Sequence, residues 1–205
     1  MIRLLTVVFF LSLFTLTVHS QELDLYMFSG HTFGHSFPIS GGDARIFGGH
    51  TYGGSMSYNV SDYYAFELIF SRQNSRATAF SEQAGIDVDA KMSSNFILLG
   101  GNRLMPINEK AIFHGGIKLG AVVYAARFNA FDPITKFAAG VGGGFRYILS
   151  HQVALRAQAH LNFPVTDIGA SLWWSPGSGT SVGVAGYTPI IQFGFTAGVM
   201  LSLSR

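Results

Sequence analysis

The stretch VALRAQAHLNFPV at 153–165 alternates without interruption between two kinds of side chain. One face is apolar: Val153, Leu155, Ala157, Ala159, Leu161 and Phe163. The other face is largely polar: Ala154, Arg156, Gln158, His160 and Asn162. Because successive side chains of a β-strand point to opposite faces, this pattern predicts a strand. In a soluble sheet the polar face meets water, whereas in a membrane barrel the apolar face meets lipid. The alternation fits both.

The N-terminus has the features of a secretory signal peptide. Arg3 precedes an apolar run from Leu4 to about Leu16, and Val18 and Ser20 occupy the −3 and −1 positions of a cleavage site. The apolar run is shorter than the roughly 20 residues of a membrane-anchoring helix, which is the alternative. We expect cleavage after Ser20, which leaves a signal peptide at 1–20 and one mature domain at 21–205.

The composition excludes several classes of function. Charged residues make up 12% of the chain, against about 25% in ordinary globular domains. The basic residues are scattered and the formal net charge is +2, so no nucleic-acid partner is expected. Cysteine is absent, which excludes disulfides, thiolate metal sites and cysteine nucleophiles. We expect no metal and no cofactor, and the GVGGGF stretch at 140–145 lacks the Lys-Ser/Thr of a phosphate-binding loop.

Eight segments are expected to form strands: 22–32, 45–60, 63–74, 88–103, 112–127, 135–148, 152–164 and 188–204. The connections after the second, fourth and sixth segments are short, and the others are longer. An even number of antiparallel strands, with short turns at one end and long loops at the other, is typical of an outer-membrane barrel. The predicted fold is therefore all-β: a closed, antiparallel, eight-stranded up-and-down transmembrane β-barrel.

Two observations favour this membrane barrel over a soluble β-sandwich, the alternative. Several segments are much longer than an average soluble strand of about 5–6 residues, and they reach the roughly 9–11 residues of a tilted membrane strand. In the last segment, IIQFGFTAGVMLSLS, large apolar residues alternate with small or polar ones, which suits a crowded interior better than a wet surface. A sheet in hydrocarbon cannot leave an edge unpaired, so the strands must close into a ring.

The polar faces of these strands bring charged residues into the predicted lumen. The four that fall at similar depth are Glu67, Lys118, Arg146 and Arg156. Side chains fill the interior of an eight-stranded barrel, and buried charges there must be paired. We expect Glu67 to be the shared acceptor of the three basic residues. The polar residues expected around them are Gln158, His160, Asn162 and Gln192. The cluster is interpreted as a packed plug, and a gate or selectivity site is the alternative.

Four stretches carry a resemblance to known proteins: YGGSMSYNVSDYYAFELIFSRQ (52–73), NFILLGGNRLMPI (95–107), GVGGGFRYILSHQVALRAQAHLNFPV (140–165) and the final strand with QFGFTAG. On these stretches the chain resembles the eight-stranded outer-membrane barrels grouped with outer-membrane protein A and the opacity proteins. The resemblance implies a monomer in the outer membrane, with both termini periplasmic. Its implied partners are membrane lipid, lipopolysaccharide and, during insertion, the barrel-assembly machinery. The ending LSLSR departs from the family, whose barrels usually end in an aromatic residue.

Three functions are compatible with such a barrel. The first is a non-catalytic role in envelope structure or surface interaction, with Trp173 and Trp174 as candidate loop contacts or, equally, as part of a rim girdle. The second is a narrow porin-like channel for ions or small solutes. The third is a lipid A-modifying enzyme. We do not expect the third, because the related deacylases carry His, one residue, then Ser, and no histidine of the mature chain has a serine two positions on.

Overall fold

The computed structural model describes residues 23–39, 41–81, 85–126, 133–165, 172–173, 181–182 and 191–203. The expected signal peptide lies outside this part of the chain. None of the described residues belongs to a helix that is long and apolar enough to cross a membrane.

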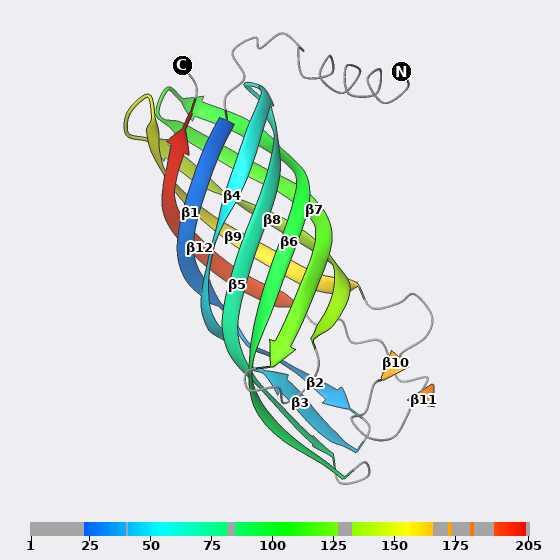
Figure 1. Cartoon of the computed structure of the whole chain (residues 1–205). Coiled ribbons are helices and arrows are strands. Elements are labelled where there is room, and N and C mark those ends of the chain that lie inside the picture. Colours follow the sequence, from blue (N-terminus) through cyan, green and yellow to red (C-terminus); the bar gives the residue numbers. More distant parts are fainter. Residues whose placement is uncertain are drawn as a thin grey trace, which may run out of the picture.

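Eight long strands form a closed antiparallel ring (Figure 1). In ring order they are β1 (Leu23–Thr32), β4 (Gly49–Ser61), β5 (Tyr64–Ser81), β6 (Ile86–Asn108), β7 (Ala111–Ala126), β8 (Ile134–Ile148), β9 (Val153–Val165) and β12 (Gln192–Ser202). The ring closes where β12 pairs with β1, from Asp24 opposite Ser202 to Thr32 opposite Gly194. The predicted eight-stranded barrel is confirmed, and each predicted segment overlaps one strand of the ring.

Part of the sheet was not predicted. The segment expected at 45–60 begins instead in a separate hairpin of β2 (His35–Ile39) and β3 (Gly42–Ile46), whose turn contains Gly41 with a positive φ of 75°. β3 pairs with residues 77–81 of β5, and β5 continues its pairing with β6 as far as Ser81 opposite Ile86. We call β2, β3 and residues 75–81 and 86–91 of β5 and β6 the extension. It projects from the end of the barrel opposite the start of β1 (Figure 1).

Two further differences concern strand ends and loops. β6 continues to Asn108, through most of the LMPINEK stretch that we expected to be a turn, and the turn itself is only Glu109–Lys110. In the long connection after β9, β10 (Leu172–Trp173) pairs with β11 (Ser181–Val182).

The outer wall of the barrel is apolar and the inner wall is polar. Along β5, Phe66 and Leu68 are exposed, while Ala65, Glu67 and Ile69 between and beside them are buried. Met27 and Ile117 are both 66% exposed, an arrangement that would be unfavourable in water. The alternation at 153–165 therefore points its apolar face outward, as the membrane interpretation predicts.

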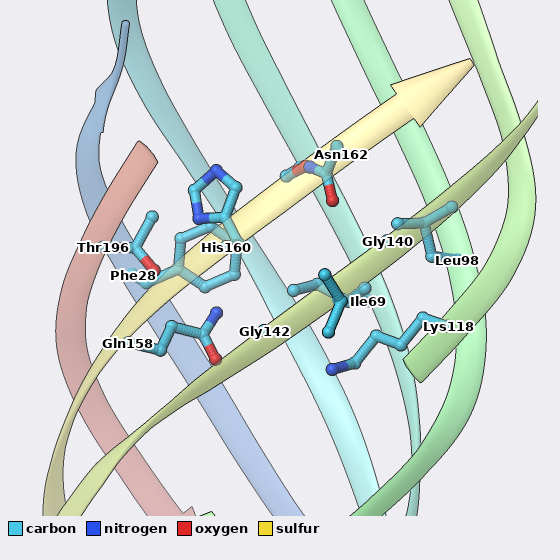
Figure 2. A pocket seen from close by; sticks show the side chains of 12 residues that line it. Phe28, Ile69, Leu98, Lys118, Gly140, Gly142, Gln158, His160, Asn162 and Thr196 are labelled. Carbon is cyan, nitrogen blue, oxygen red and sulfur yellow. The ribbon is translucent and has the colours of Figure 1, made fainter. Parts of the chain in front are cut away.

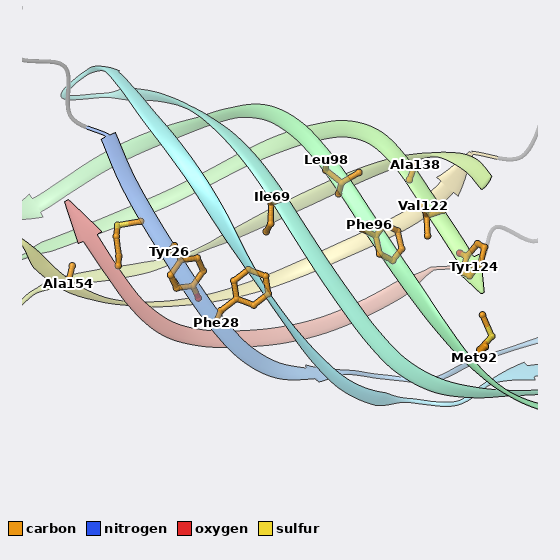
Figure 3. Close-up of a cluster of buried hydrophobic side chains, with 11 residues drawn as sticks. Tyr26, Phe28, Ile69, Met92, Phe96, Leu98, Val122, Tyr124, Ala138 and Ala154 are labelled. Carbon is orange, nitrogen blue, oxygen red and sulfur yellow. The ribbon is translucent and has the colours of Figure 1, made fainter. Parts of the chain in front are cut away.

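The lumen also holds a row of apolar side chains (Figure 3). Its buried members are Tyr26, Phe28, Ile69, Met92, Phe96, Leu98, Val122, Tyr124, Ala138, Ala154 and Met200. Figure 3 shows Tyr26 and Ala154 near the end where β1 begins, and Phe96, Val122, Tyr124 and Met92 towards the extension. The charged residues of the lumen are therefore followed, on the side of the extension, by an apolar layer.

Candidate functional site

Glu67 stands at the centre of the charged lumen and is completely buried on β5. One carboxylate oxygen, Oε1, accepts hydrogen bonds from Ser55 Oγ at 2.6 Å and from Arg156 Nη1 at 2.7 Å. The other, Oε2, accepts from Asn102 Nδ2 at 2.6 Å and Arg156 Nη2 at 3.1 Å, and lies 3.1 Å from Lys118 Nζ. The buried carboxylate therefore has two cationic partners and two neutral donors, which compensates for its loss of hydration.

Arg156 is bound on every side of its guanidinium group. Besides Glu67, it donates from Nε to His114 Nε2 at 3.0 Å and from Nη2 to Gln158 Oε1 at 2.7 Å. Its guanidinium carbon lies 4.8 Å from the centre of the Tyr26 ring, in cation–π range. Neither His114 nor Tyr26 was among the predicted lumen residues, although both have the inward parity of their strands.

One predicted pairing is wrong. Arg146 does not share Glu67 but donates from Nη1 to Asp24 Oδ2 at 3.1 Å. Arg146 stands directly opposite Arg156 in the β8–β9 pairing. Because Arg156 occupies both oxygens of Glu67, Arg146 is stabilised by a different carboxylate. Asp24, which the sequence reasoning missed, also accepts from Asn59 Nδ2 at 3.0 Å and Ser202 Oγ at 2.5 Å.

The predicted polar residues divide between the cluster and a small neighbouring cavity, whose lining Figure 2 shows. Gln158 joins Arg156, whereas His160 Nε2 lies 3.4 Å from Thr32 Oγ1. Asn162, Gln158 and His160 all line the cavity, together with Lys118. Gln192 is buried, but neither amide atom has a hydrogen-bond partner among the described residues. Six of the eight predicted lumen residues therefore belong to the Glu67 cluster or line the cavity. Arg146 belongs to the separate pair with Asp24, and Gln192 stands opposite Asn162 without lining the cavity.

The remaining predicted site residues are the two tryptophans of the long connection after β9. Trp174 and the side chain of Trp173 lie outside the part of the molecule that the structure describes. Within the described ranges, no three histidine, aspartate or glutamate residues come together as a group that could hold a metal ion.

These side chains pack closely in the described part of the lumen, where Glu67, Arg156, Phe96 and Val122 are all buried. The cavity has a volume of about 30 Å³, which is enough for water but not for a passing solute. An ion moving along the lumen would have to separate the Glu67 cluster and then cross the apolar layer at Phe96 and Val122.

No protein-family model and no curated protein matches the sequence. Solved structures do match. The outer-membrane protein OprG from Pseudomonas aeruginosa superposes with a TM-score of 0.64 at 10% identity, covering 91% of this chain and 97% of that one. Neisserial surface protein A (NspA) superposes with a TM-score of 0.56 at 16% identity, covering 89% and 97%. The N-terminal barrel domain of P. aeruginosa OprF gives 0.52 at 11%, also covering 89% and 97%.

The chain is an eight-stranded β-barrel of the outer-membrane type. At these identities the likeness establishes the fold of the barrel and not its task. The apolar wall and the closed ring place this barrel in a bilayer, and the bilayer that houses this fold is the outer membrane.

Proposed function

We propose that this barrel is a sealed structural and surface-interaction protein of the outer membrane. The observation that carries the proposal is the packing around Glu67, where Arg156, Lys118, Asn102 and Ser55 occupy both carboxylate oxygens in the middle of the lumen. An open pore needs a continuous water path, and here the space beside the cluster is about 30 Å³.

The cost of opening supports the same proposal. Separating a buried ion pair leaves an uncompensated charge and costs roughly 3–5 kcal/mol. Arg156 also bonds His114 and Gln158, so displacing it breaks several contacts at once. A plug with this many bonds stabilises the barrel and keeps the lumen shut.

The extension supplies a surface for contacts outside the membrane. It carries the paired sheet beyond the apolar wall, with Phe80 54% exposed and a groove beside Asp43, Arg45 and Phe47. Exposed aromatic and arginine side chains are the residues that most often dominate protein interfaces. A surface-contact role is therefore proposed for this end of the molecule.

Planar-bilayer recording tests the sealed lumen. Purified barrel reconstituted at single-molecule density should give no steady conductance in 1 M KCl, and a control barrel of known conductance verifies the bilayer. Steady, voltage-independent conductance steps from the wild-type protein would contradict the proposal.

A narrow gated channel is the second candidate, and one observation favours it. Near the extension, Gln73, Ser94 and Gln192 are buried polar side chains whose polar side-chain atoms have no partner among the described residues. Such atoms are usually hydrated, so water would reach the upper lumen. If the Glu67 cluster is a gate rather than a plug, Glu67→Ala should conduct where the wild type is silent. A silent Glu67→Ala barrel that still folds would favour the plug.

A further inference from the structure

On one side of the barrel, the outer wall changes from apolar to polar between two neighbouring rows of residues. Cross-strand pairing through β1, β4, β5 and β6 defines two neighbouring rows, which we call lower and upper by taking the extension as the upper end of the barrel. The lower row is Met27, Gly54, Phe70 and Ile97. The next row towards the extension is Ser29, Tyr52, Arg72 and Asn95. The boundary between the rows is where the hydrocarbon would end and lipid headgroups would begin.

The change is confined to this side. The upper row continues onto β7 and β8 as Val123 and Thr135, without a charge. On β12, Phe193 and Phe195 face outward, and Phe33, which follows β1, stacks on Phe193 with ring centres 5.8 Å apart. The polar upper row is therefore a local feature of the wall formed by β1, β4, β5 and β6, and it does not continue around the whole barrel.

Basic residues outnumber acidic ones just above the boundary. Arg76 stands opposite Lys91, and Asp89 forms an ion pair with Arg76. Arg72 donates from Nε to Asn74 Oδ1 at 3.3 Å. Among the described residues, no carboxylate lies within ion-pair distance of Arg72 or Lys91. Arg72 in the polar row and Lys91 in the extension therefore have no carboxylate partner in the part of the chain that the structure describes.

An arginine that has no carboxylate partner at the edge of a membrane would be stabilised by binding an anion. Charge is costly near hydrocarbon, and the planar fork of a guanidinium group matches the oxygens of a phosphate in a two-bond arrangement. Directly below Arg72, Phe70 is exposed, and Gly54 beside it adds no side chain to the wall. Met27 and Ile97 of the same row are exposed as well, so an acyl chain lying under its own headgroup would contact an apolar surface there.

We infer that Ser29, His50, Arg72, Arg76 and Lys91, the polar strip, bind the phosphate-bearing headgroup of an outer-leaflet lipid, namely phosphorylated lipid A. Ser29 Oγ and His50 Nε2, 2.8 Å apart on the outer wall, lie beside Tyr52 and add neutral hydrogen-bonding groups for the sugar. Met27, Phe70 and Ile97 receive the acyl chains. The inference rests on the proposed function only in requiring the extension to lie outside the cell.

The test measures lipid A binding by the refolded full-length mature barrel in detergent micelles, from its thermal stability as lipid A is added. Three additives are compared: purified lipid A, chemically dephosphorylated lipid A and inorganic phosphate. The variant is Arg72→Gln, and Arg72→Lys retains the charge without the fork. Arg103→Gln is the matched control, because Arg103 is also exposed on the outer wall, opposite Tyr64, at the other edge of the barrel.

Lipid A should raise the Tm of the wild type, and dephosphorylated lipid A and inorganic phosphate should not. Arg72→Gln should bind lipid A about tenfold more weakly, as expected for one charge-assisted contact, with Arg72→Lys in between and Arg103→Gln unchanged. Equal binding by Arg72→Gln and wild type, an equal loss in Arg103→Gln, or an equal effect of dephosphorylated lipid A would overturn the inference. A response to inorganic phosphate alone would also overturn the inference.

If Arg72→Gln does not refold, the double variant Arg76→Gln/Lys91→Gln is tested instead and judged by the same criteria. The bilayer conductance of the barrel does not affect lipid A binding. The proposal of a sealed lumen and the inference of a lipid site can therefore be contradicted separately.

Discussion

Arg156 donates to both carboxylate oxygens of Glu67, from Nη1 to Oε1 at 2.7 Å and from Nη2 to Oε2 at 3.1 Å. β5 and β9, which carry the two residues, stand on opposite sides of the eight-membered ring. The pair therefore spans the lumen and ties the two halves of the barrel together. Neither residue exposes more than 2% of its surface.

Glu67→Ala should be among the most destabilising substitutions in the barrel. It leaves Arg156 and Lys118 buried without their carboxylate, which should lower the free energy of unfolding by roughly 3–5 kcal/mol. Urea titration in lipid vesicles, followed by circular dichroism, measures the loss. Glu109→Ala, in the exposed β6–β7 turn, is the matched control and should stay within about 0.5 kcal/mol of wild type. A Glu67→Ala barrel as stable as this control would show that the pair contributes nothing.

The second ion pair should show energetic coupling. Asp24 and Arg146 lie 3.1 Å apart and are both buried, so either single substitution leaves one charge alone. Removing both, as Asp24→Ala/Arg146→Met, should cost about 1–3 kcal/mol less than the sum of the two single losses. The same urea titration supplies the three free energies. Asp24→Ala combined with Glu109→Ala should be additive, and additivity in the Asp24–Arg146 cycle itself would refute the pairing.

The face of each residue could be predicted from sequence, but the partner of each charge could not. A period of two assigns Glu67, Arg146 and Arg156 to the lumen, because the strands alternate their faces regularly over the stretches that carry these residues. Which carboxylate an arginine meets depends on strand tilt and stagger, which parity does not contain. That is why Arg146 was assigned to Glu67, and why Asp24, two residues into its segment, was overlooked.

The extension was missed for a related reason. The membrane argument relies on a large apolar outer face, and outside the bilayer that requirement ends. In β3 the outward residues are Asp43 and Arg45, and in the upper part of β6 they are Asp87, Asp89 and Lys91. Asp43, Asp87 and residues 75–81 of β5 fall outside the predicted strand segments, and only cross-strand pairing makes them part of the sheet.

The inward glycines of β8 should be intolerant of larger side chains. A Cβ atom at Gly144 would collide with the backbone oxygen of Ala157 and would lie 2.6 Å from Gln158 Cα, neither of which can move without shifting β9. Gly144→Val should therefore lower the free energy of unfolding by about 1–3 kcal/mol through overpacking. At Gly101, on the outer wall, no atom lies within 4 Å of an added Cβ, and Gly101→Val should be neutral or slightly stabilising. Equal effects at the two positions would mean that the lumen is not packed.

Asp89 should titrate below the usual range of an aspartate. In the extension, outside the membrane-spanning part of the strands, the hydrogen bond and charge of Arg76 lower the pKa of the Asp89 carboxyl group. A lowered pKa means that the pair stabilises the extension above about pH 3.9, the ordinary value, and that this contribution is lost as the pH falls through the lowered pKa. Carbon-13 NMR of the Asp89 carboxyl group measures its midpoint. Arg76→Gln should return that midpoint towards about 3.9, and an unchanged midpoint would contradict the pairing.

The orientation of the barrel can be tested with single cysteines, because the natural sequence has none. Phe80 lies in the extension and Asp62 in the short β4–β5 turn at the other end, and both are exposed. If the extension faces the cell exterior, a membrane-impermeant maleimide should label Phe80→Cys on intact cells. It should label Asp62→Cys only after the outer membrane is permeabilised, because the short turns of such barrels face the periplasm. Leu68→Cys, on the lipid-facing wall, should react slowly in both cases, since thiolate formation is suppressed in hydrocarbon. Labelling of Asp62→Cys on intact cells would show that the barrel has the opposite orientation. The polar strip would then lie at the inner leaflet, away from lipid A.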